Sequence, residues 1–291
     1  MMRSSESTQR NHRSRAEGPQ RPLAHGRWLT QVFARSVAEL SAIDTRVLLQ
    51  QIIGVDPRIS SIEPTPAQIK KYKSFLVRRA AGEPVAYIIG SREFYGRDFK
   101  VSSATLIPRP DSETLIDAAK ELLSPDFNGR IVDLGTGSGA LLLTLSKEFP
   151  HSTGTGIDIS KAALRIARAN AKSLGVKSTF KFADMRDFTV AKKFDLVIAN
   201  PPYIKSSDIK KLQTDVKDFE PKAALDGGRD GYDFYRAIAK LDILKPQGII
   251  LLEIGAGQAS RIEKIFVGAN YKLIKSFKDL AGITRVLAFK L

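Results

Sequence analysis

The strongest constraint on the fold is a regular alternation of apolar, β-branched runs with amphipathic stretches, which starts after Gly129 and continues almost to the C-terminus. Short runs rich in Val and Ile predict buried strands, and apolar positions spaced by three and four residues predict helices. A chain that alternates in this way favours a doubly wound, mostly parallel sheet covered by helices. The expected strands are residues 130–134, 155–158, 179–183, 194–199, 248–253, 271–277 and 284–290, and the expected helices are residues 140–148, 161–173, 232–244 and 259–267.

The last two expected strands break the alternation. Only a short loop around residues 279–282 joins them, whereas parallel neighbours need a much longer crossover, so they are predicted to be antiparallel. A seven-stranded, mostly parallel sheet with an antiparallel last strand is the pattern of class I methyltransferases. We therefore expect this α/β fold for residues 107–291, which form the predicted catalytic domain.

Upstream of this domain the chain falls into three predicted regions. Residues 1–25 are rich in Ser, Arg and Gln, which predicts a disordered basic extension. Residues 26–82 carry helical spacing and predict a small helical domain that recognises a partner. Residues 83–106 contain two β-rich stretches, 83–90 and 94–101, and predict a β-hairpin linker.

Composition excludes several kinds of site. The chain has 291 residues and no cysteine, which excludes disulfides, zinc thiolate sites and cysteine nucleophiles. Its three histidines lack metal-ligand spacing, so no metal site is predicted, and no apolar run approaches the length of a membrane span. A net charge of +15 fits either a polyanionic partner or a solvated lysine surface, and the scattered lysines do not separate these two interpretations.

A glycine-rich loop follows the first strand of the catalytic domain. Asp133-Leu134-Gly135-Thr136-Gly137-Ser138-Gly139 combines a sharp turn with room for a ligand to approach the backbone. Asp158 closes the second strand, where a carboxylate can accept two ribose hydroxyls. Asp184 and Met185 follow the third expected strand. Asp184 is a candidate acceptor for an adenine amino group, and Met185 is a candidate packing surface for the adenine ring.

A dinucleotide site is the alternative for this loop. Its glycine spacing differs from G-x-G-x-x-G, the pattern of pyrophosphate binders. Asp133 before the turn suits a cationic ligand better than a phosphate. S-adenosylmethionine carries a sulfonium and an ammonium group, so it is the favoured cofactor.

The sequence Asn200-Pro201-Pro202-Tyr203 follows the fourth strand. Each proline fixes φ and lacks an N–H, and each residue before a proline is held extended. This rigid segment presents one carboxamide and backbone carbonyls, which can accept hydrogen bonds from a planar amino group. A strand-ending turn with a buried tyrosine is the structural alternative.

Residues 205–231 lack clear periodicity. A long loop between sheet elements is often functional, so we expect it to form a wall of the substrate groove. Near the start of the catalytic domain, Asp111 or Ser112 is expected to cap a helix over 112–123. Arg109 and Glu113 are expected to form an ion pair there.

These motifs resemble the HemK/PrmC peptide chain release factor glutamine methyltransferases. The resemblance covers residue 82 to the C-terminus, and the helical segment before it lies where the family has its small N-terminal domain. The motifs that carry it are Gly82-Glu83-Pro84-Val85-Ala86-Tyr87, Arg92-Glu93-Phe94-Tyr95, Leu106-Ile107-Pro108-Arg109-Pro110-Asp111, the glycine-rich loop with Ala140, Asn200-Pro201-Pro202-Tyr203-Ile204 and Phe219-Glu220-Pro221. The basic extension before Arg27 is not required by the family.

The resemblance implies methyl transfer from S-adenosylmethionine to the side-chain nitrogen (N5) of the glutamine in the Gly-Gly-Gln motif of class I release factors. It implies cofactor contacts from residues 135–139, Asp158, Met185 and Asn200, and substrate contacts from residues 200–203. A ribosomal-protein glutamine methyltransferase, an adenine-N6 methyltransferase of DNA or RNA, and a non-catalytic binding module are the alternatives.

The expected mechanism uses positioning, because an amide nitrogen is a poor nucleophile. Asn200 Oδ1 and the Pro201 carbonyl would each accept one N–H of the glutamine amide, and Tyr203 would stack on its face. Glu253 is the nearest candidate for a proton acceptor, although a structural role is favoured for it.

We expect a cytoplasmic, bacterial monomer without a stable nucleic-acid complex or membrane contact. The arginine-rich start keeps a mitochondrial location as the alternative.

Overall fold

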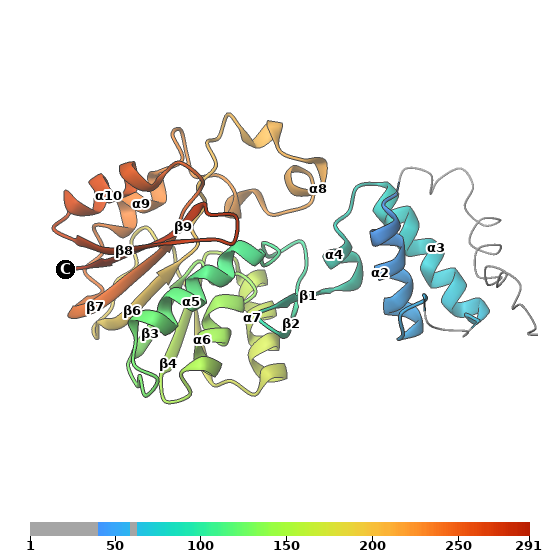
Figure 1. Ribbon diagram of the computed structural model, residues 1–291, viewed down its shortest axis with the longest axis horizontal. Coiled ribbons are helices and arrows are strands. Elements are labelled where there is room, and N and C mark those ends of the chain that lie inside the picture. The colour runs from blue at the N-terminus through green and yellow to red at the C-terminus, as the bar shows by residue number, and fades with distance from the viewer. Residues whose placement is uncertain (1–39, 59–62) are drawn as a thin grey trace, which may run out of the picture. The chain divides into compact units, whose positions relative to one another are not determined.

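The computed structural model describes residues 40–58 and 63–291 (Figure 1). The predicted basic extension 1–25 and the start of the predicted helical domain lie outside the described residues. Residues Ser41–Leu291 form one compact unit, so the predicted boundary near residue 82 stays a prediction.

The structure contains a seven-stranded sheet with the strand order β5-β4-β3-β6-β7-β9-β8. Helices flank this sheet (Figure 1). Of these seven strands, β9 alone runs antiparallel, to both β7 and β8, which confirms the predicted fold class and its antiparallel last strand. The strands are β3 (Arg130–Leu134), β4 (Thr153–Asp158), β5 (Ser178–Phe182), β6 (Phe194–Ala199), β7 (Leu244–Glu253), β8 (Lys272–Lys278) and β9 (Thr284–Lys290).

Successive residues of the central strands enter two separate cores, one on each face of the sheet. In β6, Leu196 and Ile198 join one core, whereas Val197 and Ala199 join the other. Helices α5 (Glu113–Leu122), α6 (Ala140–Glu148) and α7 (Lys161–Leu174) contribute to the first core, and α9 (Asp233–Ile238) and α10 (Ala259–Val267) to the second. A central strand buried on both faces explains why its sequence is continuously apolar.

The remaining described elements precede the sheet or lie in the loop after β6. They are α2 (Ala42–Ile53), α3 (Pro66–Ala80), α4 (Val85–Ile89), β1 (Ser91–Phe94), β2 (Arg97–Lys100), α8 (Thr214–Lys217) and short 3₁₀ turns at Pro110–Ser112, Ile209–Lys211 and Lys222–Ala224. Helix α3 begins with a capping box in which Thr65 and Gln68 bond each other's backbone. No described helix is long and apolar enough to cross a membrane.

The linker differs from its prediction at its first stretch. Residues 83–90 were expected to be extended, but Val85–Ile89 form helix α4, which ends at Gly90 with a φ of 84°. Burial of Ala86, Tyr87 and Ile88 outweighs the strand preference of their β-branched neighbours. A hairpin is present in the linker, but it pairs β1 with β2 rather than residues 83–90 with 94–101. Its turn, with positive φ at Tyr95 and Gly96, lies inside the second predicted stretch.

Two helix predictions also need correction. The helix expected over 232–244 ends at Ile238, because the chain from Leu244 already pairs with β6 as part of β7. Neither Asp111 nor Ser112 caps α5 through its side chain. Asp111 instead pairs with Arg285 at 2.7 Å.

Asn170 joins three parts of the structure that are distant in sequence. Its Oδ1 accepts the Lys100 backbone N–H at 2.8 Å, and its Nδ2 donates to the carbonyls of Lys100 at 3.0 Å and Ser138 at 2.8 Å. The side chain lies on α7 and is 1% exposed. It therefore ties the hairpin and the glycine-rich loop to the same helix.

We predict that Asn170→Ala lowers the free energy of unfolding by about 2–4 kcal/mol, because buried backbone groups lose their partners. Asn170→Asp should lower it at least as much, since a carboxylate cannot donate to the two carbonyls. Urea denaturation measures both effects. The exposed Asn128→Ala serves as the control and should stay within about 0.5 kcal/mol of the unchanged protein; equal stability of all four proteins would contradict the assigned role.

Candidate functional site

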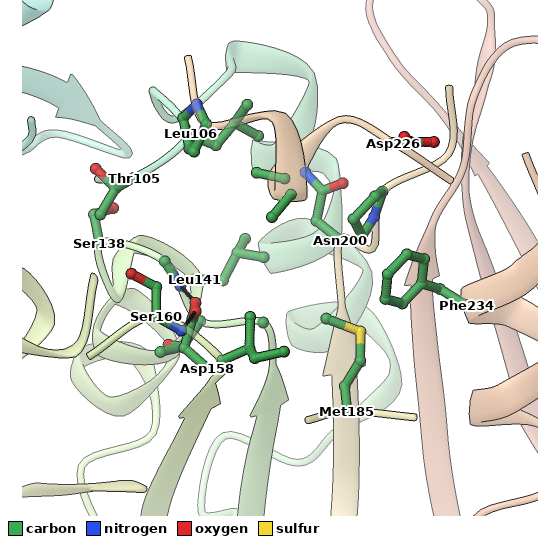
Figure 2. Close-up of a pocket in the computed structure, with 18 of the residues that line it drawn as sticks. Thr105, Leu106, Ser138, Leu141, Asp158, Ser160, Met185, Asn200, Asp226 and Phe234 are labelled. Atoms are coloured by element: carbon green, nitrogen blue, oxygen red, sulfur yellow. Dashed lines mark hydrogen bonds between the residues drawn. The ribbon is translucent and has the colours of Figure 1, made fainter. Parts of the chain in front are cut away.

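A cavity of about 450 Å³ lies at the carboxyl ends of β3, β4, β5 and β6 (Figure 2). The order of the strands changes direction between β3 and β6, and ligands of doubly wound sheets bind outside the strand ends at such a switch point. Nine of the predicted site residues line the cavity: Gly135, Thr136, Gly137, Ser138, Asp158, Asp184, Met185, Asn200 and Pro202. Gly139, Pro201 and Tyr203 are not among the lining residues.

The glycine-rich loop needs its glycines for two different reasons. Gly135 has a φ of 79°, and a Cβ placed there would lie 2.4 Å from Met185 Cε. Gly139 has a φ of 81° and contacts the helices, because its Cβ would lie 3.1 Å from Leu143 and 3.3 Å from Ala167. Gly139 thus shapes the loop and the start of α6 without lining the cavity.

Asp158 faces the glycine-rich loop from the end of β4. Its carboxylate accepts the backbone N–H of Gly137 at 2.9 Å and that of Ser160 at 2.8 Å. Burial raises the pKa of this carboxyl group, and the two backbone N–H groups oppose that rise. Each carboxylate oxygen can accept a further hydrogen bond, so Asp158 keeps capacity for ligand hydroxyls.

Asp133 lies beneath the loop and is not a lining residue of the cavity. It is 1% exposed, and one carboxylate oxygen accepts the Thr136 hydroxyl at 2.6 Å. Within the described residues the other oxygen has no hydrogen-bond partner. Burial is the main cause that raises the pKa of Asp133 to about 7, and the nearby Asp158 adds to the rise.

Asp184 and Met185 lie where the sequence placed them, on the cavity wall after β5. Both carboxylate oxygens of Asp184 are already engaged by Arg186, with the Nη2 contact at 2.5 Å. The Arg186 guanidinium lies 5.7 Å from the centroid of the Phe234 ring. Arg186 and Phe234 also line the cavity, and sequence reasoning missed both because neither belongs to a recognisable motif.

Asn200 ends β6 at the edge of the cavity, and its carboxamide is drawn in Figure 2. Its Nδ2 donates to the Ser112 hydroxyl at 3.2 Å. Within the described residues, neither Asn200 Oδ1 nor the Pro201 carbonyl accepts a hydrogen bond. Both predicted acceptors for a substrate amide are therefore free.

Three glycines enclose the backbone of the segment 200–203. A Cβ at Gly227 would lie 2.7 Å from the Pro202 carbonyl oxygen, and one at Gly231 would lie 2.5 Å from the Tyr203 carbonyl oxygen. Gly255 approaches the Tyr203 ring in the same way, at 3.0 Å. The ring packs against the core rather than lining the cavity, so its predicted stacking on a substrate stays a prediction.

The loop 205–231 lines the cavity as expected, through Ser206, Pro221, Ala223, Ala224, Asp226 and Gly228. Glu220 is 5% exposed and fixes this wall to the segment that directly follows the linker. Its carboxylate accepts the Ile107 backbone N–H at 3.2 Å and pairs with Arg109. The predicted pairing of Arg109 with Glu113 is wrong, because Glu113 accepts the Tyr95 backbone N–H instead.

The cavity fits S-adenosylmethionine by its size and its chemistry. Its volume lies in the usual range for small-molecule sites. Asp158 offers a carboxylate for ribose hydroxyls, Met185 and Ile159 offer apolar surface for a planar ring, and the glycine-rich loop allows close approach. Asn200 lines the same cavity and contributes a carboxamide to its wall.

Comparison with known proteins identifies relatives along most of the chain. A family model described as "PrmC N-terminal domain" matches residues 27–90, and one described as "Methyltransferase small domain" matches residues 111–218. A "Release factor glutamine methyltransferase" of Bradyrhizobium diazoefficiens is 41% identical over 261 residues, covering 86% of this chain and 88% of that protein. One from Koribacter versatilis is 39% identical, covering 89% of this chain and 97% of that protein.

Solved structures resemble the chain at the level of the fold. A methyltransferase from Pyrococcus furiosus superposes with a TM-score of 0.51 at 17% identity, covering 75% of this chain and 96% of that one. This likeness supports the sheet topology described above.

We predict that the free energy of unfolding falls as the pH rises from about 5 to about 7, partly through Asp133. Its folded pKa of about 7 lies above the ordinary value of 3.8, so the folded chain binds the proton more tightly than the unfolded chain between these values. At about 1.4 kcal/mol per pKa unit, Asp133→Asn should reduce this fall by about 2–3 kcal/mol.

Urea denaturation at several pH values measures this slope. Asp195→Asn is the matched control, because hydrogen bonds from the Arg130 backbone and Lys245 lower the pKa of Asp195 despite its partial burial, so this carboxylate stays ionised over the pH range of the experiment. An unchanged slope in Asp133→Asn would contradict the prediction.

We predict that Asp158→Ala weakens S-adenosylmethionine binding about 10- to 100-fold, the effect of losing hydrogen bonds to a charged acceptor. Isothermal titration calorimetry measures the dissociation constant. The exposed Asp187→Asn should retain the affinity within about twofold, and equal affinities for all three proteins would refute a ribose contact.

Proposed function

Because the chain belongs to the release factor glutamine methyltransferase family, we propose that it transfers a methyl group from S-adenosylmethionine to the side-chain amide nitrogen of a glutamine in a peptide chain release factor. The Gly-Gly-Gln motif of class I release factors is the proposed location of that glutamine. The observation that carries the proposal is the pair of free acceptors, Asn200 Oδ1 and the Pro201 carbonyl, at the edge of a cavity that fits the cofactor.

The two acceptors address the weak nucleophilicity of an amide. The nitrogen lone pair is delocalised into the carbonyl, so the site acts by holding the –NH2 group in line with the methyl donor. Asn200 Oδ1 and the Pro201 carbonyl each accept one N–H, which orients the amide plane and draws electron density onto nitrogen. When bound, S-adenosylmethionine supplies the electrophilic methyl group on its sulfonium.

The rigidity of the acceptors follows from the chain itself. Pro201 and Pro202 fix the backbone, and neither carries an N–H that competes for the carbonyls. The close approach of Gly227 and Gly231 then holds this segment in one conformation. The acceptors are therefore in place before the substrate arrives, which lowers the entropic cost of orienting it.

The walls of the cavity separate the two reactants. Residues of the glycine-rich loop, Asp158 and Met185 face the cofactor, whereas the loop 205–231 borders the space beside Asn200. The contacts of Glu220 with Arg109 and Ile107 hold the loop against the segment that follows the linker. Closing the site in this way excludes water, which strengthens the hydrogen bonds to the amide.

The remaining parts of the proposal concern partners and location. The curated relatives named above are bacterial, which supports a cytoplasmic protein that acts on release factors. We propose a monomer without a stable nucleic-acid complex. Methylation of a ribosomal protein or of adenine in DNA or RNA is the alternative activity, since the same acceptors suit an exocyclic amino group.

The test is methyl transfer from tritiated S-adenosylmethionine to separate acceptors: a class I release factor, the same factor with its Gly-Gly-Gln glutamine replaced by alanine, ribosomal proteins, DNA and RNA. We expect label only on the unchanged release factor, with mass spectrometry placing one methyl group on that glutamine. Label on another acceptor alone would overturn the proposal.

We predict that Asn200→Ala lowers the methylation rate of the release factor by about 10²- to 10³-fold, as expected for losing one preorganised group at the reacting centre. The initial rate at saturating concentrations of both substrates measures this effect. Asn128→Ala, far from the cavity lining, should leave the rate unchanged. A normal methylation rate in Asn200→Ala would exclude the proposed hydrogen bond between the substrate amide and Asn200 Oδ1.

A further inference from the structure

Glu253 is a buried carboxylate beside the catalytic Asn200 that the mechanism above does not use. It ends strand β7 and is 3% exposed. Strands β6 and β7 are parallel, and Ala199 pairs with Leu252, so the next residues of both strands, Asn200 and Glu253, are neighbours. Glu253 does not line the cavity, and one of its carboxylate oxygens has no hydrogen-bond partner within the described residues.

Ser112 lies between the two side chains. It is 4% exposed, and its hydroxyl oxygen accepts Asn200 Nδ2–H at 3.2 Å. Burial raises the pKa of Glu253, and the nearby polar side chains of Ser112 and Asn200 oppose that rise. Glu253, Ser112 and Asn200 therefore form one polar cluster, in which Ser112 and Asn200 line the cavity and Glu253 lies behind them.

The chemistry of the cluster determines which way the Asn200 carboxamide points. The Ser112 hydroxyl oxygen already accepts the Asn200 Nδ2–H, which leaves the hydroxyl proton for an ionised carboxylate, a group that only accepts hydrogen bonds. The amide must then turn its Nδ2 toward Ser112 and Glu253. Its Oδ1 is left for the cavity, which is the orientation that the substrate amide needs.

We propose that Glu253 is a positioning residue, whose carboxylate, together with Ser112, holds the Asn200 carboxamide with Oδ1 toward the glutamine amide. The proposal rests on the proposed function for its substrate. The orientation of Asn200 itself is a property of the protein alone and can be observed without any substrate.

Protonation of Glu253 removes the preference for this orientation of the Asn200 carboxamide. A neutral carboxyl group can donate its O–H to Ser112, and the Ser112 hydroxyl is then free to donate to Asn200 Oδ1. The amide can turn over and present Nδ2, a donor, to a substrate that is itself a donor. Activity should therefore fall as the pH drops through the pKa of Glu253.

The charges around Glu253 place this transition near neutral pH. Burial raises its pKa to about 7, and Asp111 adds to the rise, whereas Ser112, Arg285 and Asn200 lower it. Arg285 pairs with Asp111 at 2.7 Å and with Asp279 at 2.7 Å. The Tyr235 hydroxyl donates to the Glu253 backbone carbonyl at 2.9 Å. Burial raises the pKa of the Tyr203 phenol, and the charge of Glu253 adds to that rise.

The experiment compares the unchanged protein with Glu253→Gln and Ser112→Ala. Methylation of a class I release factor is measured from about pH 5.5 to about pH 9. For the unchanged protein, kcat should rise with pH through an apparent pKa near 7. Above that pKa, both variants should have a kcat roughly 10-fold lower, as for a lost orienting contact. In Glu253→Gln, kcat should no longer fall as the pH drops, so the variant and the unchanged protein should have similar kcat values near the lowest pH. The KM for S-adenosylmethionine should stay within about twofold in both variants.

A second readout needs no substrate. The side-chain ¹⁵N resonance of Asn200 should shift with pH in the unchanged protein and stay constant in Glu253→Gln. Asp195→Asn, which removes a carboxylate from the opposite end of β6, is the matched control and should leave kcat and its pH profile unchanged.

Each outcome decides the proposal. A normal kcat in Glu253→Gln would overturn the proposal. A lowered kcat that still falls with decreasing pH as in the unchanged protein would also overturn it, because a glutamate with a merely structural role would give that result. If the unchanged protein did not methylate release factors, the proposed function would fail, and the Asn200 resonance would still decide the role of Glu253. If Glu253→Gln did not fold, the loss of kcat and the altered Asn200 resonance in Ser112→Ala would carry the test.

Discussion

The site depends on the parallel pairing of β3 with β4 and β6, and of β6 with β7. Parallel strands end at the same edge of the sheet, so residues from distant parts of the sequence meet there without any specific contact between them. Asp158, Asn200 and Glu253 are each the last residue of a strand or the residue after it. Once the hydrophobic pattern has set the register, these polar groups are brought together.

Burial then gives these groups their properties. Asp133 and Glu253 are both at most 3% exposed, and burial is the main cause that raises the pKa of each to about 7. Neither carboxylate lines the cavity. Each lies behind a residue that does, Asp133 behind Thr136 of the glycine-rich loop and Glu253 behind Asn200. The cavity wall is therefore supported by a second layer of polar groups whose charge depends on pH near neutrality.

The sequence predicted the sheet closely because the signals were local. Strands β3, β6 and β9 have their predicted bounds, and a buried strand is recognisable from its own residues. Helix α4 was missed because packing of Ala86, Tyr87 and Ile88 against the protein outweighs their local preference. The partner of Arg109 was also missed, since Glu220 is more than a hundred residues away and no spacing rule connects them. Motifs located the ligand-facing residues, whereas the glycines around 200–203 depend on contacts that only the folded chain reveals.

The order of the strands also divides the chain between its two reactants. The residues that fit the methyl donor end strands β3, β4 and β5, on one side of the switch point, and they occupy the single stretch 135–185. In the proposed function, the acceptor side follows in the chain, from Asn200 through the loop 205–231, and residues 104–106 of the linker line the same cavity. Donor and acceptor contacts would then lie on separate stretches of the chain, so one sheet could carry the same methyl donor in enzymes that modify different acceptors.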